Sequence, residues 1–127
     1  SGADAFISVA AVSDWRPEHV SDQKIKKDGK AVTLSLTENP DILSEVGHLS
    51  AGRPAVVIGF AAETENIISY ASTKAADLII ANDAAHALGS EDNDAVFVTE
   101  SGAEPLGPGP KSRVAEAILD RLASLLA

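Results

Sequence analysis

The amino-acid sequence predicts an α/β layered domain built around a mostly parallel β-sheet. Continuous apolar runs rich in β-branched residues recur along the chain, which is typical of strands buried on both faces. Segments with helical periodicity lie between several of these runs. A length of 127 residues suffices for one compact core, so we expect a single domain over residues 1–127.

The first quarter of the chain predicts a strand followed by a hairpin. Residues 4–12, "DAFISVAAV", form an apolar run that we expect to be a buried strand ending before Pro17. In "KIKKDGKAVTLSLT" (24–37), Asp28-Gly29 is a strong hairpin-turn signal, and the residues after it alternate between apolar and polar. We therefore expect a hairpin over about residues 22–38, with one face in water.

A helix start follows the hairpin. In "NPDILSEVGHL", Asn39 can cap the helix, Pro40 suits its first turn, and Asp41 suits its positive end. Because the first strand of the chain looks central and has almost nothing before it, we interpret the sequence as a piece of a larger α/β unit.

The rest of the chain alternates strands with helices. We expect strands at 55–60 and in "DLIIAND" (77–83), with a helix between them at 65–76. A fourth strand is predicted in "AVFVTE". The proline-rich "GAEPLGPGP" (102–110) is interpreted as a loop containing a stiff turn. The chain closes with an amphipathic helix over 111–127, whose apolar stripe is Val114, Ile118, Leu122, Leu125 and Leu126.

Charge and composition exclude several classes of function. The formal net charge of −9 disfavours general nucleic-acid binding, so no nucleic-acid partner is expected. No apolar run approaches the 18 or so residues that span a bilayer, and no signal peptide is visible, so no membrane association is expected. The absence of cysteine excludes disulfides and thiolate metal sites and favours a cytoplasmic location. His19, His48 and His86 lack a tight ligand spacing, so no metal site built from the chain is expected.

Polar residues follow the predicted strands and the hairpin. Ligands of open parallel sheets bind outside the carboxyl ends of the strands, so convergence of these residues would make a binding site. The alternative is that they only cap helices and form turns. The residues concerned are Asp14, Asn39, Asp41, Glu63, Thr64, Asn82 and Asp83.

Lysine is concentrated in the hairpin. Four of the six lysines, Lys24, Lys26, Lys27 and Lys30, lie within "DQKIKKDGK" of this acidic chain. Lysines on a hairpin can simply protect an exposed edge from pairing with another chain. They can also form a basic flap over phosphates, because lysine binds phosphate as a flexible point charge. Two roles are likewise possible for Phe60, which could pack in the core or stack on a base.

Five motifs in this order resemble one enzyme family. They are "AAVSDWRP", "KIKK", "LTENPDIL", "VIGFAAET" and "ADLIIAND". The sequence resembles the synthetase half of the bacterial bifunctional phosphopantothenoylcysteine decarboxylase/phosphopantothenate–cysteine ligases, which act in coenzyme A biosynthesis. The resemblance runs from Ala3 to the final helix. It implies a Rossmann-like three-layer sandwich with a β-hairpin flap, of which this chain is the C-terminal portion. It also places FMN only in a separate decarboxylase domain.

The resemblance implies a CTP-dependent ligation. The carboxylate of 4′-phosphopantothenate attacks the α-phosphate of CTP with Mg²⁺ assisting, pyrophosphate leaves, and an acyl-cytidylate forms. The amine of cysteine then displaces CMP and forms an amide. The three substrates are therefore CTP, 4′-phosphopantothenate and cysteine, and the flap of this family also helps to form a homodimer.

Residue roles also follow from the resemblance. Lys24, the first lysine of "KIKK", would be the essential flap lysine at the phosphates and the acyl-cytidylate. Phe60 would lie against the cytosine or the ribose. The helix start at residue 39 would offer free N–H groups to the nucleotide. The remaining nucleotide contacts would come from Ala10, Ala11, Asp14, Asn39, Pro40, Asp41 and Ile42.

The sequence departs from the family pattern in two places. The family carries two lysines about four residues apart before the "AND" strand, but this segment holds only Lys74. Counted back from Asp77 it matches the second lysine, and counted forward from Phe60 it matches the first. The upstream half, with its glycine-rich nucleotide turn, is also missing. The alternative hypothesis is therefore a non-catalytic nucleotide-binding or dimerisation fragment.

Overall fold

The structure is a computed structural model, and it describes residues 2–62, 66–82 and 92–127. The chain divides into two compact units. The larger unit contains residues 1–9 and 42–127, and the smaller unit contains residues 10–41.

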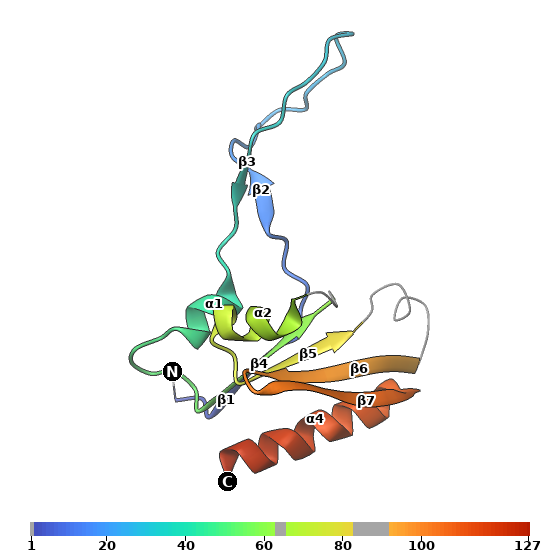
Figure 1. Ribbon diagram of the computed structural model, residues 1–127. Coiled ribbons are helices and arrows are strands. Elements are labelled where there is room, and N and C mark those ends of the chain that lie inside the picture. Colours follow the sequence, from blue (N-terminus) through green and yellow to red (C-terminus); the bar gives the residue numbers. More distant parts are fainter. Residues whose placement is uncertain (1, 63–65, 83–91) are drawn as a thin grey trace. The chain divides into compact units, whose positions relative to one another are not determined.

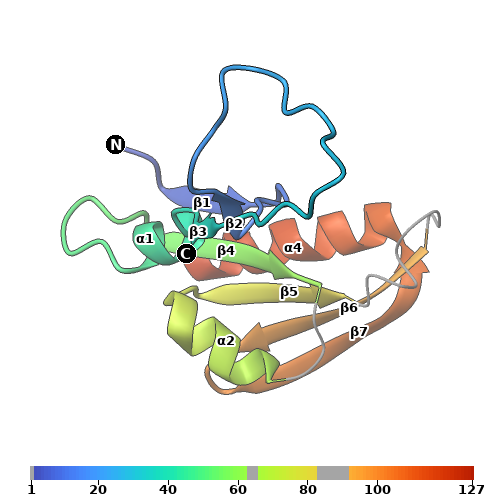
Figure 2. The same cartoon turned by 90° about the horizontal axis from the view of Figure 1, so that it is seen from above.

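The larger unit is built on a five-stranded mixed sheet with the order β1-β4-β5-β6-β7 (Figures 1 and 2). β1 (Ala5–Ser8), β4 (Val56–Ala61) and β5 (Leu78–Asn82) are parallel to one another. β6 (Asp92–Thr99) runs antiparallel to β5, and β7 (Gly102–Pro110) runs antiparallel to β6.

Helices cover both faces of this sheet (Figure 1). α1 (Ile42–Gly47) and α2 (Ile67–Lys74) lie on one face, and α4 (Lys111–Leu126) lies on the other. The alternation of side chains along β4 separates the two core layers. Ile58 packs into the layer of α4, whereas Val57 packs into the layer of α1 and α2. The Rossmann-like three-layer sandwich is thereby confirmed.

The predicted loop at residues 102–110 is wrong, because this segment is β7, the edge strand of the sheet. Its three prolines, Pro105, Pro108 and Pro110, each pair in register with a residue of β6. An edge strand hydrogen-bonds to one neighbour only, so a proline whose missing N–H faces outward removes no ladder bond. The pairing of β6 with β7 shifts register between Ala95 and Val96, as at a β-bulge.

The predicted apolar stripe of the final helix is confirmed only in its first half. Val114 and Ile118 are buried, and Leu122 packs at the edge of the same cluster. Leu125 and Leu126, however, remain 43% and 45% exposed. The helix therefore extends past the part of the sheet that covers it.

The smaller unit is a ribbon that reverses at the predicted turn. Gly29 has a φ of 77°, a value that favours glycine, and the N–H of Lys30 donates to the Asp28 carboxylate at 2.9 Å. The paired strands lie further from the turn than expected. They are β2 (Trp15–Pro17) and β3 (Leu36–Glu38), which are antiparallel, and no strand is described in residues 18–35.

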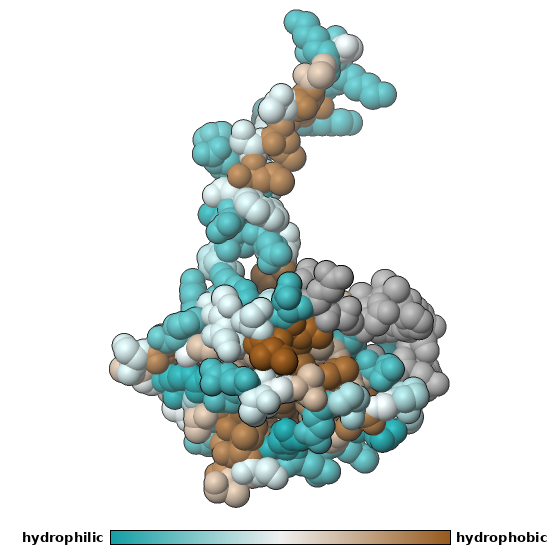
Figure 3. Space-filling view, viewed as in Figure 1, coloured by the Kyte–Doolittle hydropathy of each residue, from teal (hydrophilic) through white to brown (hydrophobic). Residues whose placement is uncertain are grey.

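We expected one face of this ribbon to be exposed to solvent and the other to be buried, but within the smaller unit the apolar face is exposed as well. Val32, Leu34 and Leu36 alternate in the sequence, but they are 72%, 65% and 50% exposed. The apolar side chains along the ribbon appear brown in Figure 3. A single two-stranded ribbon has no second layer of its own in which to bury such residues.

Candidate nucleotide site

Two predicted site residues of the smaller unit, Asp14 and Asn39, lie side by side. Trp15 pairs with Glu38 in the β2–β3 ladder, so the positions just beyond that pair face each other. The backbone N–H of Asn39 donates to the carbonyl of Asp14 at 2.8 Å. The ladder thus joins two residues that are 25 positions apart in the sequence.

The side chain of Asn39 is held by the same strand ends. Its Nδ2 donates to the carbonyl of Ser13 at 2.7 Å, and its Oδ1 accepts from Nη1 of Arg16 at 3.1 Å. The same Arg16 nitrogen donates to the carbonyl of Glu38 at 2.9 Å. The predicted capping role of Asn39 is therefore replaced by a cross-strand role, because both polar atoms of its amide bond to residues 13–16. Arg16 was not predicted as a site residue; its only sequence signal was its place in "SDWRP".

The four hairpin lysines project from the unpaired part of the ribbon. Lys24, Lys26, Lys27 and Lys30 are all exposed. In the part of the chain that the structure describes, no hydrogen bond or ion pair holds the Lys24 ammonium. Five of the ten Lys and Arg residues of this acidic protein lie in residues 10–41. Residues 10–41 also contain six acidic residues, but residues 23–36, around the turn, carry four lysines against Asp28 alone, so the excess of cations that can meet phosphate is confined to that part of the ribbon.

The "NPDI" motif is divided between the two units. Asn39, Pro40 and Asp41 belong to the smaller unit, and Ile42 begins α1 in the larger unit. The predicted helix thus begins three residues later than Asn39. Ala10 and Ala11 are exposed at the start of the smaller unit, directly after β1 and Val9.

In the larger unit, Phe60 lies near the end of β4. It pairs with Ile80 and packs, half-buried, against the cluster beneath α4. The core covers part of the Phe60 ring, and the rest of the ring remains exposed. The predicted contact of this ring with a base stays a prediction.

Lys74 lies at the opposite end of the parallel strands. It is in the last turn of α2, and its Nζ is 5.1 Å from the ring centroid of Tyr70. Three residues later, the Asp77 carboxylate accepts a hydrogen bond from the N–H of Val57, near the start of β4. α2 runs from the end of β4 back to the start of β5. The structure therefore does not bring Lys74 to the strand end that holds Phe60.

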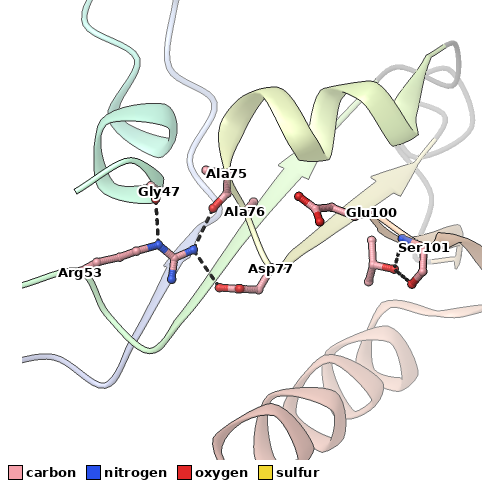
Figure 4. A pocket seen from close by; sticks show the side chains of 8 residues that line it. Gly47, Arg53, Ala75, Ala76, Asp77, Glu100 and Ser101 are labelled. Carbon is pink, nitrogen blue, oxygen red and sulfur yellow. Dashed lines mark hydrogen bonds and ion pairs between the residues drawn. The ribbon is translucent and has the colours of Figure 1, made fainter. Parts of the chain in front are cut away.

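A polar cluster that was not predicted from the sequence lies at the starting edge of β4 and β5. Arg53 donates from Nε to the carbonyl of Gly47 at 2.8 Å, and from Nη2 to the carbonyl of Ala75 at 2.8 Å and to Asp77 at 3.0 Å (Figure 4). Asp77 also accepts from the N–H of Val57 at 2.7 Å. An Arg and an Asp just before neighbouring strands were the only sequence signal.

This cluster borders an open hollow of about 500 Å³. The guanidinium points to backbone carbonyls and to Asp77 (Figure 4), so its donors already have partners inside the protein. Ligands of open α/β sheets bind at the other edge, outside the carboxyl ends of the strands. We therefore interpret the Arg53–Asp77 cluster as a structural clamp.

Several predicted residues lie outside the described ranges. Glu63, Thr64 and Asp83, which follow two of the strands, and His86 are among them. Within residues 2–62, 66–82 and 92–127, no three His, Cys, Asp or Glu side chains come together as a metal site would require. No helix among those residues is both long enough and apolar enough to cross a bilayer.

The sequence matches one family model over almost its whole length. Residues 1–126 match the family described as DNA/pantothenate metabolism flavoprotein C-terminal domain. Among curated relatives named coenzyme A biosynthesis bifunctional protein CoaBC, that of Haemophilus influenzae is 51% identical over 82 residues, covering 61% of this chain and 20% of the relative. That of Vibrio cholerae is 39% identical over 123 residues, covering 90% and 31%, and that of Escherichia coli K12 is 37% identical over 127 residues, covering 92% and 31%. The chain thus spans a third or less of these relatives.

Two solved structures share the fold. One is a crystal structure of the C-terminal domain of coenzyme A biosynthesis bifunctional protein CoaBC, with a TM-score of 0.71 and 28% identity over 97% of this chain and 57% of that one. The other is a DNA/pantothenate metabolism flavoprotein from Streptococcus pneumoniae, with a TM-score of 0.73 and 23% identity over 95% of this chain and 63% of that one. The second likeness concerns the fold alone.

Proposed function

This chain belongs to the DNA/pantothenate metabolism flavoprotein C-terminal domain family, and we propose that it is the C-terminal part of a CTP-dependent ligase that joins 4′-phosphopantothenate to cysteine. The names of its relatives support a place in coenzyme A biosynthesis. The observation that carries the proposal is the smaller unit: its base brings Asp14 next to Asn39, and its ribbon exposes Lys24.

The proposed reaction needs positive charge more than it needs a nucleophile of the protein. The substrate carboxylate attacks the α-phosphorus of CTP, the bond to the bridging oxygen breaks, and pyrophosphate carries away the electron pair. In the second step the amine of cysteine attacks the acyl carbon, loses a proton, and CMP leaves. Negative charge grows on phosphate oxygens in the first step, and a mobile ammonium such as that of Lys24 stabilises it.

We expect a magnesium ion to be held by the phosphates of the nucleotide and not directly by the described side chains. No cluster of three acidic or histidine side chains is described that could hold the ion directly. Mg²⁺ keeps several waters and commonly binds through substrate phosphates, so it would arrive as the Mg–CTP complex. The ion would neutralise phosphate charge there. FMN belongs to the separate decarboxylase domain implied by the family resemblance and has no role in the proposed ligation.

Pyrophosphate release by the longer protein that carries this sequence tests the proposal. Release is expected only when CTP and 4′-phosphopantothenate are both present, and CMP is expected only after cysteine is added. Pyrophosphate formed from CTP without the acid, or equally from ATP and GTP, would contradict the ligase and its nucleotide.

A second candidate function is a nucleotide-binding or dimerisation module without catalysis. Two observations favour it for the 127 residues alone: the chain spans 57% and 63% of the two solved structures, and α2 carries a single lysine. The exposed apolar side chains of the ribbon would form the homodimer contact. Calorimetry with CTP, ATP and GTP, together with the mass in solution, tests this candidate. Micromolar CTP binding by a dimer without turnover would support it.

A further inference from the structure

The paired part of the ribbon has two faces that carry different side chains. β2 and β3 pair in antiparallel fashion, with Arg16 directly opposite Thr37 (Figure 1). Side chains opposite each other in such a pair lie on the same face, and the next residue along either strand lies on the other face. Arg16 and Thr37 therefore share one face, and Trp15 lies on the other. Asn39 belongs to the face of Arg16, because its Oδ1 accepts a hydrogen bond from the guanidinium.

The guanidinium of Arg16 is held through one of its nitrogens. Nη1 donates to the carbonyl of Glu38 at 2.9 Å and to Oδ1 of Asn39 at 3.1 Å. The amide of Asn39 is itself fixed, since its Nδ2 donates to the carbonyl of Ser13 at 2.7 Å. Because a guanidinium is planar, these bonds also restrict the direction in which its other N–H groups point.

The other edge of the same guanidinium, formed by Nε and Nη2, has no partner among the described residues. No ion pair in the described part of the chain neutralises the charge of Arg16 either. The hydroxyl of the half-buried Thr37 makes no hydrogen bond within residues 2–62, 66–82 and 92–127. The Nε–Nη2 edge presents two parallel N–H groups, the arrangement that binds two oxygens of one phosphate, and a hydroxyl can donate to the same phosphate.

Arg16 differs from the other cations of the smaller unit in its setting. Residues 10–41 contain five Lys and Arg residues, and only Arg16 among them lies in β2 or β3. A lysine on the unpaired ribbon loses rotamer freedom when it binds an anion, whereas the guanidinium of Arg16 is already oriented. The lysines therefore suit a charge that moves during a reaction, and Arg16 suits a phosphate that stays in one place.

We propose that the Nε–Nη2 edge of Arg16 and the hydroxyl of Thr37 bind a phosphate group of a substrate, while Asn39 holds the guanidinium in place. The ligand is a phosphate ester or a pyrophosphate group, which either CTP or 4′-phosphopantothenate can supply. No bond is made or broken at this position, so Arg16 binds and orients the substrate. The choice of these two ligands rests on the proposed function, whereas the binding of phosphate does not.

NMR of the arginine side chains in the 127-residue chain tests the contact, with inorganic pyrophosphate as the probe. The Nε–H resonance of Arg16 is expected to shift as pyrophosphate is added. That of Arg53 is expected to stay in place, because its Nε–H already donates to the carbonyl of Gly47. Absence of a shift at Arg16, or an equal shift at Arg53, would overturn the proposal. CTP and 4′-phosphopantothenate are then titrated separately, and the one that shifts the Arg16 resonance at the lower concentration supplies the phosphate.

Substitutions of Arg16 test whether its paired N–H groups matter. Arg16→Gln is expected to weaken pyrophosphate binding about tenfold, because charge-assisted hydrogen bonds are lost. Arg16→Lys keeps the charge without the paired N–H groups and is expected to lie between Arg16→Gln and the parent. Lys30→Gln is the control, since it removes the same charge from the same unit, and is expected to weaken binding less than about twofold. A loss for Arg16→Gln no larger than for Lys30→Gln, or parental affinity in Arg16→Lys, would contradict the site.

A double-substitution cycle separates direct binding from support of Asn39. In an Asn39→Ala background, Arg16→Gln is expected still to weaken pyrophosphate binding, because the guanidinium itself contacts the phosphate. No further loss in that background would make Arg16 only a support of Asn39 and would overturn the proposal. None of these measurements depends on turnover. A shift at Arg16 in a protein that releases no pyrophosphate from CTP would keep the phosphate site and remove the ligase.

Discussion

The side-chain amide of Asn39 donates to the carbonyl of Ser13 at 2.7 Å and thereby ties the end of β3 to the start of β2. Nη1 of Arg16 donates to the other atom of the same amide, Oδ1, at 3.1 Å. These bonds fix the orientation of an amide that the sequence predicted both as a helix cap and as a nucleotide contact. They also place Asn39 beside Asp14, the two residues with which the proposed nucleotide site begins.

Replacing Asn39 tests whether this arrangement serves the nucleotide. Asn39→Ala in the longer protein is expected to raise the KM for CTP by about tenfold, because a polar group that is oriented by two bonds is lost. Arg16→Gln is expected to act in the same direction through Asn39, and Arg16→Lys to restore part of the affinity. An unchanged KM in Asn39→Ala would remove this residue from the site. An effect of Asn39→Ala without any effect of Arg16→Gln would limit the role to Asn39 itself.

The hairpin lysines are expected to be unequal. Lys24→Ala should lower the rate of pyrophosphate release by roughly 100-fold, because removing one preorganised donor or cation at developing charge has an effect of that order. Lys30→Ala, past the Asp28-Gly29 turn on the same ribbon, is the matched control and should stay within a few-fold of the parent. Full pyrophosphate release by Lys24→Ala would contradict the flap role.

The Arg53–Asp77 clamp is expected to contribute to the stability of the larger unit. Asp77→Ala leaves the N–H of the fully buried Val57 without its side-chain acceptor, and it removes one partner of Arg53. We expect the free energy of unfolding to fall by about 2–3 kcal/mol in urea titrations of the 127-residue chain. Asp77→Asn keeps an acceptor oxygen and is expected to lose about 1 kcal/mol. Equal losses in the two variants would show that the hydrogen bonds are not what matters.

Gly47 is expected to tolerate no side chain. A Cβ at this position would overlap the backbone carbonyl oxygen of Lys74, which cannot move aside as the end of a flexible side chain could. Gly47→Ala should therefore lower the free energy of unfolding by about 1–3 kcal/mol. Gly2→Ala is the control, since no heavy atom lies within 4 Å of a Cβ there. A neutral Gly47→Ala in urea unfolding would mean that α1 and α2 can separate at little cost.

Local patterns in the sequence were enough to predict most of the layered fold. The apolar runs at β4 and β5 and the periodicity of α4 are local signals, since a strand buried on both faces and a helix on a core each need a particular spacing of apolar residues. The turn at Asp28-Gly29 is local as well, because it depends on the conformational freedom of one glycine. The five motifs likewise sufficed to indicate the family.

Other features depend on partners that the fold brings together, and local patterns did not predict them. β7 is a strand because β6 lies beside it, although its own residues resemble a loop. Asn39 bonds to Ser13 and Arg16 because the ribbon brings together chain segments that are far apart in the sequence. Lys74 lies away from Phe60 because α2 returns to the starting edge of the sheet. The hydrogen bonds of Asn39 join residues 23 and 26 positions apart, and no local pattern of side chains encodes them.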